Sequence, residues 1–197
     1  MEKSTKSALI VIGSILLLCG CAVSAVFVGG LWSLGHVVRW ADNGTTKDPQ
    51  EAIRVGSEIA DFEIPQGFDS PYGVHFGDVY MVGYTSQSKQ AHILIAQFPK
   101  GTSINVDEML RQISESNSDP NSNWYKTETT LIEEKPVTIC EQETTLSISE
   151  GISGNGITYR SAVAKFEGRG GPALVMVAGP FDEWDLDMVE TFISSIH

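Results

Sequence analysis

The first 40 residues contain the longest apolar run of the chain. No charged residue lies between Ser7 and Gly35, and the 24 residues from Ala8 to Leu31 are almost entirely apolar or small. A helix of that length spans about 36 Å, which exceeds the roughly 30 Å hydrocarbon core of a bilayer. Trp32 follows the run, where interfacial aromatic side chains are expected. The pattern predicts a single transmembrane helix over residues 8–32.

Two other interpretations of this run stay open. Leu18-Cys19-Gly20-Cys21 resembles a bacterial lipobox, with Cys21 as the lipidated residue. A cleaved signal peptide is the second alternative, with Lys3 and Lys6 as its basic start. The apolar part of a signal peptide is typically about 7–15 residues long, and this run is longer. The sequence therefore favours an uncleaved anchor over a lipoprotein or a cleaved peptide.

Basic residues near the anchor predict its orientation. Lys3 and Lys6 favour a cytoplasmic N-terminus, although Arg39 and Lys47 on the other flank weaken the bias. We therefore expect a cytoplasmic tail over residues 1–7. The chain would then be a single-pass membrane protein with an extracytoplasmic C-terminal domain.

A juxtamembrane linker with a short helix is expected over residues 33–56. Asn43 begins an Asn-Gly-Thr triplet that matches the N-glycosylation acceptor pattern. A three-residue match is common by chance, so an unmodified turn is the simpler interpretation of Asn43. Asp48 and Pro49 offer an N-cap and a first helical residue, and Gly56 ends the expected helix.

Residues 57–197 show short alternating runs that are typical of strands. Strands are expected at 59–64, 79–84, 92–98, 127–132, 136–140, 143–149, 158–166 and 173–178. A helix is expected to place Val106, Met109, Leu110 and Ile113 on one face, and a closing helix is expected to begin at Asp182. Short hairpin connections predict an α+β domain, with a mainly antiparallel β-sheet and two or three packed helices.

The segment from Ser57 to Phe68, SEIADFEIPQGF, resembles the opening of a group of uncharacterised, membrane-anchored bacterial proteins. The strand order and the closing Phe192-Ile193-Ser194-Ser195-Ile196 are similar to the Mog1/PsbP-like superfamily, which includes the DcrB lipoproteins. This resemblance covers residues 57–197 and rests on pattern rather than on a diagnostic motif. It implies an antiparallel sheet flanked by helices and a binding or assembly role, and it carries no functional residues over.

The net charge divides the chain into two unlike pieces. Residues 1–41 carry +2 and residues 42–197 carry −14, which together give the net charge of −12. An acidic domain excludes nucleic acid as a partner, because phosphate binding needs a basic surface. Anionic lipid headgroups would repel the domain within a Debye length of about 8 Å. We therefore expect it to stand off the bilayer and to meet a less acidic partner.

No residue pattern identifies a catalytic, cofactor-binding or metal site. Three cysteines are too few for a disulfide framework. The four histidines are scattered without metal-ligand spacing; they are His36, His75, His92 and His197. Cys140 is the only cysteine beyond the anchor, and a role as nucleophile would need a nearby histidine such as His92 or His75. A buried, inert thiol is the simpler interpretation.

Two further clusters suggest a ligand but have structural explanations. The stretch from Gly151 to Gly156 lacks the Lys-Ser/Thr pair of a P-loop, and a strand is expected to follow it, so a hairpin turn explains its glycines. The acidic residues Asp182, Glu183, Asp185 and Asp187 lack the Gly and the distal Glu of a calcium loop. Carboxylates are also expected at the start of a helix.

The sequence favours a non-enzymatic, membrane-anchored module that binds a protein partner in the cell envelope. A membrane-tethered hydrolase with a site assembled from distant residues is the alternative. A concave pocket joining His92 or His75 to Cys140, or to several carboxylates, would favour the hydrolase. A convex surface with an exposed apolar patch would favour binding. A third hypothesis is that the anchor itself pairs with another helix through its small residues, Gly20, Ala22, Ala25, Gly29 and Gly30.

Overall fold

The computed structural model describes residues 45–46, 48–86, 88, 90–105, 129–152 and 156–197. Several predictions concern other parts of the chain and lie outside these residues. They are the cytoplasmic tail, the transmembrane helix over residues 8–32, the lipidation of Cys21, the glycosylation of Asn43, the place of His36 and the helix from Val106 to Ile113. Within the described residues, no helix is both long enough and apolar enough to cross a membrane.

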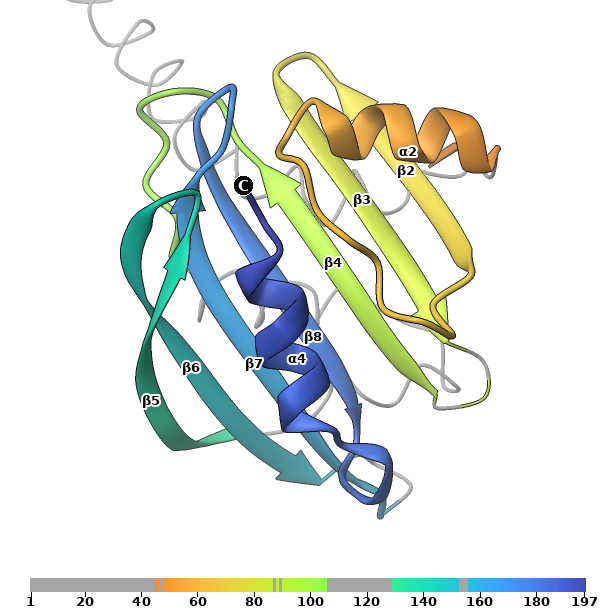
Figure 1. The fold of residues 1–197 in the computed structure, drawn as a ribbon, viewed down its shortest axis with the longest axis vertical. Helices are drawn as coiled ribbons and strands as arrows, with labels where there is room; N and C mark the ends of the chain where they lie inside the picture. Colours follow the sequence, from red (N-terminus) through yellow and green to blue (C-terminus); the bar gives the residue numbers. More distant parts are fainter. Residues whose placement is uncertain (1–44, 47, 87, 89, 106–128, 153–155) are drawn as a thin grey trace, which may run out of the picture.

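A single antiparallel sheet forms the body of the described domain (Figure 1). Its strands are β1 (Thr45–Thr46), β2 (Ser70–Phe76), β3 (Val79–Ser86), β4 (Ala91–Gln97), β5 (Thr129–Ile139), β6 (Gln142–Ile152), β7 (Thr158–Glu167) and β8 (Pro172–Pro180). Their order across the sheet is β1-β2-β3-β4-β8-β7-β6-β5. Each half of the sheet is therefore a meander of sequential strands, and the halves meet where β4 pairs with β8. This arrangement confirms the predicted α+β domain with an antiparallel sheet.

In the part of the chain that the structure describes, two α-helices cover one face of this sheet (Figure 1). Helix α2 (Pro49–Ser57) packs on β2 and β3, and α4 (Leu186–Ser194) contacts β5. Asp48 caps α2 as predicted, because its side chain accepts a hydrogen bond from the backbone N–H of Gln50 at 2.9 Å. The helix ends one residue beyond Gly56.

The predicted start of the closing helix at Asp182 is wrong. Asp182 lies in a short 3-10 helix, η2 (Phe181–Glu183), and the N-cap of α4 is Asp185, whose Oδ1 accepts from the N–H of Met188 at 3.0 Å. Between them Trp184 has an extended backbone, with φ −72° and ψ 123°. This extended residue lets the indole pack against the core, so the helix can begin only after it.

Both faces of the central strands are apolar. The larger core lies between the sheet and the helices, and its buried members include Ile93, Ile95, Leu146, Val175, Val177, Val189, Phe192 and Ile193. The opposite face carries a second cluster of Leu94, Ala96, Phe98, Val163, Leu174 and Met176. A strand buried on both faces loses the alternating pattern, which explains why β4 and β8 appear in the sequence as continuous apolar runs.

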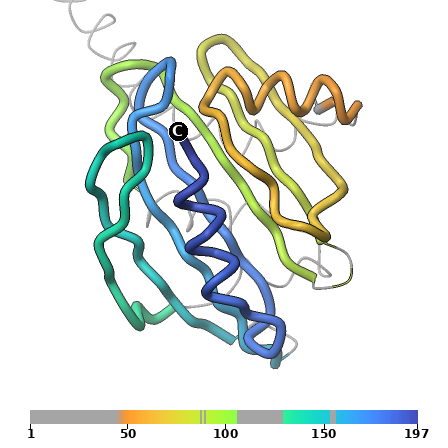
Figure 2. Tube along the Cα trace, in the orientation of Figure 1, coloured from red at the N-terminus to blue at the C-terminus, as the bar shows by residue number. Residues whose placement is uncertain are grey.

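The strand expected at residues 59–64 is a connection without regular secondary structure, and it does not join the sheet. Ile59 and Ala60 are buried, so their apolar character is real. The backbone pairs with the end of the chain instead, since Asp61 and His197 exchange hydrogen bonds of 2.8 and 2.9 Å. Figure 2 shows the C-terminus beside this connection.

Two other strands differ from the sequence prediction. β2 was not predicted, because Pro71 and Gly73 interrupt its apolar pattern. The strands expected at 127–132 and 136–140 form one long strand in the described residues, β5, with an irregular register between Leu131 and Glu133. Pro136 lies within β5, where it is tolerated because β5 is the last strand of the sheet.

Candidate functional site

Cys140 and His92 lie at opposite ends of the sheet. His92 pairs with Ala178 of β8, Ala178 pairs with Ser161 of β7, and Ser161 pairs with Ser149 of β6. His92 therefore lies level with Ser149 across the sheet. Cys140 lies in the turn just before Gln142, the first residue of β6. The seven steps along β6 from Gln142 to Ser149 correspond to about 23 Å. A nucleophile and its base need hydrogen-bond contact, so these two residues do not form a catalytic pair.

The surroundings of Cys140 also argue against a nucleophile. Burial raises the pKa of its thiol, and the charge of Arg169 offsets only part of that shift. The backbone N–H of Cys140 donates to the carbonyl of Ile196 at 3.1 Å, which ties the turn to the end of the chain. A thiol with a raised pKa carries little thiolate at neutral pH and reacts slowly. Cys140 is half-buried rather than fully buried, so the predicted buried thiol is only partly covered.

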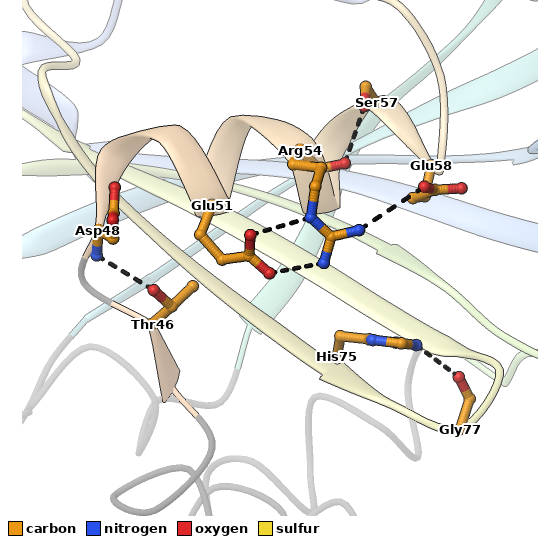
Figure 3. A network of polar contacts seen from close by, with 8 residues as sticks. All are labelled: Thr46, Asp48, Glu51, Arg54, Ser57, Glu58, His75 and Gly77. Atoms are coloured by element: carbon orange, nitrogen blue, oxygen red, sulfur yellow. Dashed lines mark hydrogen bonds and ion pairs between the residues drawn. The ribbon is translucent and has the colours of Figure 1, made fainter.

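His75 is engaged within its own hairpin (Figure 3). Its Nε2 donates to the carbonyl of Gly77 at 2.7 Å, and its ring stacks on Tyr80 with centroids 4.3 Å apart. Nearby on α2, the Nε of Arg54 donates to Glu51 at 2.9 Å (Figure 3). These charges are solvent-exposed, so they support the helix only weakly and do not build a buried site.

His92 and His197 complete the described histidines. Burial lowers the pKa of His92, so its neutral form is favoured in the folded protein. His197 is exposed, and its Nδ1 donates to the carbonyl of Ser195 at 2.7 Å. In the described part of the chain, no group of three or more His, Cys, Asp or Glu residues could hold a metal ion.

The Gly151–Gly156 stretch connects two antiparallel strands, because β6 ends at Ile152 and β7 begins at Thr158. Gly156 has φ +82°, a conformation that suits glycine in a turn. Residues 153–155 lie outside the described set. A strand follows the turn, as the hairpin prediction required, so the helix N-terminus of a phosphate loop is not present here.

One hollow of about 400 Å³ lies beside the β7–β8 turn. Its lining consists of Lys100, Gly101, Thr102, Ser103, Glu167 and Pro172. This set supplies one amine and one carboxylate but neither a histidine nor a cysteine. It therefore does not provide the histidine–cysteine pocket that the hydrolase hypothesis required.

Exposed apolar side chains gather at one end of the sheet. Seven large apolar residues among those described are exposed: Ile53, Phe76, Leu131, Ile132, Ile152, Ile157 and Phe181. Five of them lie where β5 and β7 begin and where β6 and β8 end. Figure 1 shows the arrowheads of β6 and β8 pointing toward this end of the sheet, with β7 between the two strands. Contiguous exposed apolar groups mark interaction surfaces. Leu131 pairs with Ser149 and so lies on the other face of the sheet from Ile152.

We call Ile152, Ile157, Arg160 and Phe181 the strand-end patch. The guanidinium carbon of Arg160 lies 4.4 Å from the ring centroid of Phe181, a cation–π contact. The Nε of Arg160 also donates to Glu150 at 2.9 Å. Glu150 pairs in register with Arg160, and Ile152 follows it on the same face of β6. Ile152 and Arg160 are therefore diagonal neighbours on the same face of the sheet.

An acidic rim adjoins the strand-end patch. Asp182 and Glu183 follow Phe181 directly, and Asp185 and Asp187 come next along the chain; all four are exposed. The one basic group of the patch, Arg160, is already paired with Glu150. The free charge beside Phe181 is therefore negative. Of the four acidic residues singled out in the sequence, Asp182 and Glu183 thus directly follow the exposed Phe181.

The strand-end patch was missed in the sequence because its members come from separate segments. Each carries a weak local signal. Ile152 and Ile157 flank a Gly-rich turn, where apolar residues are unusual. Phe181 lies between a proline and two acidic residues, outside the apolar stripe of the closing helix. Only the register of β6 and β7, together with the Arg160–Phe181 contact, shows that Ile152 and Phe181 lie at the same end of the sheet.

A solved structure with a similar fold is the solution structure of cyanobacterial PsbP (CyanoP) from Synechocystis sp. PCC 6803. The TM-score is 0.43 and the identity is 15%, over 78% of this chain and 90% of that chain. No protein-family model matches the sequence, and no curated protein matches it either.

Proposed function

We propose that this protein is a single-pass membrane-anchored protein whose extracytoplasmic α+β domain acts as a binding or assembly module in the cell envelope. The observation that carries the proposal is the gathering of five exposed apolar residues at one end of the sheet. Exposed apolar surface costs solubility unless a partner covers it. The hydrolase hypothesis has no matching support among the described residues, because its histidines and its cysteine lie far apart.

The order of the strands suits a tethered module. β1 lies at one edge of the sheet, and the proposed anchor precedes it in the chain. β6, which carries Ile152, is six strand positions away, or roughly 29 Å across the sheet. A module attached at the β1 edge would present the strand-end patch away from its attachment point.

The proposal predicts where the domain lies relative to the membrane. Spheroplasts that contain the full chain with a C-terminal epitope would be treated with protease. The proposal expects the epitope to be digested while a cytoplasmic marker stays intact. Protection of the epitope until the membrane is opened would refute the extracytoplasmic placement. Incorporation of a lipid precursor at Cys21 would instead indicate that the same domain is held by a lipid anchor rather than by a transmembrane helix.

The binding role has its own test. The full chain would be purified from mildly solubilised membranes alongside Phe181→Ser and Phe76→Ser variants. Both residues are exposed, at 44% and 62%, but only Phe181 belongs to the strand-end patch. A protein that copurifies with the wild-type chain and the Phe76→Ser variant, but is lost with Phe181→Ser, would support the module. Identical recovery from all three, together with turnover of a hydrolase substrate, would refute it.

A further inference from the structure

We infer that the strand-end patch docks a protein segment that combines an apolar anchor side chain with flanking lysine or arginine residues. This inference rests on the proposed binding role and adds the chemistry of the partner. Arg160 lies over the ring of Phe181 and is a diagonal neighbour of Ile152, so both apolar side chains flank Arg160 at this end of the sheet. Phe181 and Ile152 keep 44% and 65% of their surfaces exposed, so each has room for an incoming side chain.

Charge complementarity selects a basic partner. Beside Phe181 the exposed side chains of Asp182 and Glu183 carry negative charge, and Asp185 and Asp187 extend it. Arg160 does not neutralise this rim, because its guanidinium is held by Glu150 at 2.9 Å. Oppositely charged groups around an apolar centre speed association and exclude partners of the wrong sign.

The same charges disfavour the other occupants of an exposed apolar surface. A second copy of the chain would bring another acidic rim, since residues 42–197 carry −14. An anionic bilayer would repel the rim within a Debye length of about 8 Å. A basic protein segment is the occupant that satisfies both the apolar centre and the acidic rim.

The partner's chemistry can be read directly by photo-crosslinking in cells that express the full chain. A benzophenone amino acid would replace Phe181 in one variant and Phe76 in a matched control, because both are exposed phenylalanines on the described domain. We expect a protein adduct at position 181 and not at position 76. Mass spectrometry of the adduct is expected to place the crosslink in a segment with net positive charge.

A second pair of variants tests the rim. Asp182→Lys with Glu183→Lys reverses two rim charges, and Glu141→Lys with Glu143→Lys makes the same change in total charge at the opposite end of β6. The rim variant is expected to lower the adduct yield at position 181 by about tenfold, because attraction becomes repulsion. The control variant is expected to leave the yield unchanged. Thermal melts of each variant check that the domain still folds.

The outcomes separate the two proposals. A crosslink at position 181 to lipid, to a second copy of the chain or to an acidic segment would overturn this inference. So would equal losses of yield in the rim and control variants. A protein adduct at position 76 alone would overturn the docking surface while leaving a binding module in place. If neither position gives a protein adduct, the binding role itself fails.

Discussion

Gln97 is the buried polar side chain whose removal should cost the domain most. It ends β4 with 1% of its surface exposed, and its Oε1 accepts the backbone N–H of Gly170 at 2.7 Å. Gly170 belongs to the turn between β7 and β8. The preceding residue in this turn, Arg169, donates its backbone N–H to the carbonyl of Ile59 at 2.9 Å. The turn is therefore hydrogen-bonded on one side to β4, through Gln97, and on the other side to the connection that follows α2, through Ile59.

Replacing Gln97 with Met keeps a long unbranched side chain and removes the acceptor. The Gly170 N–H then loses its partner in a part-buried position. A donor left without a partner away from water costs about 1–3 kcal/mol. For a domain of this size each kcal/mol corresponds to roughly 2–4 °C in melting temperature, so we expect Gln97→Met to lower it by about 2–12 °C.

Gln142→Met is the matched control. Its Oε1 also accepts a backbone N–H, that of Glu167 at 3.3 Å, but this contact is exposed. Water can replace the lost acceptor there, so the free energy of unfolding should change by no more than about 0.5 kcal/mol. Urea and thermal unfolding of the full chain in mild detergent, followed by circular dichroism, would measure both variants. Equal losses of stability in the two variants would refute the role assigned to the buried acceptor.

Three further predictions follow from the local geometry. Glu141 has φ +62° in the β5–β6 turn, so Glu141→Gly should raise the free energy of unfolding by about 0.5–1 kcal/mol, measured as a higher urea midpoint; a lower midpoint would contradict it. Burial lowers the pKa of His92, so the unfolded state binds its proton first and stability should fall as pH drops below about 6.5. His92→Asn should flatten that part of the stability profile, and an unchanged slope would exclude His92 as its source. Burial raises the pKa of the Cys140 thiol, so iodoacetamide at pH 7.5 should alkylate it more slowly in the folded than in the urea-unfolded chain, as followed by peptide mass spectrometry.

Local sequence signals predicted those elements whose stability is local. Asp48 and Pro49 begin α2 because capping depends only on neighbouring residues. The hairpin of β6 and β7 was predictable because alternation of side chains and a Gly-rich turn coincide there. The α+β class followed from such elements together with short connections.

The elements that were mispredicted depend on contacts that are distant in sequence. The segment from Ile59 to Ile64 has the composition of a strand, but its partner is the chain end at His197 rather than a neighbouring strand. β2 contains Gly73, whose added Cβ would lie 3.0 Å from the backbone of Ala52 in α2. That glycine weakens the strand signal in the sequence, and the reason for it is the close packing of a helix.

The candidate site was less predictable than the fold. Patterns of histidine, cysteine and carboxylate residues can be sought in a sequence, because catalytic and metal chemistry requires defined donors. A binding surface requires only that apolar side chains remain exposed, and exposure depends on the whole fold. Ile152 and Phe181 became recognisable as lying at the same end of the sheet only through the register of β6, β7 and β8.

The location of the charge explains how an acidic domain can bind and still select its partner. The net charge of −14 is spread over residues 42–197, so it repels any acidic surface only weakly. At the strand-end patch the carboxylates of Asp182 and Glu183 lie beside the exposed ring of Phe181, so attraction and apolar burial act at one place. The rim should set the rate of association and its salt dependence, whereas Phe181 should set the lifetime of the complex. Loss of the ring and reversal of the rim should therefore change different kinetic constants, and a shared effect on the dissociation rate alone would argue against this division.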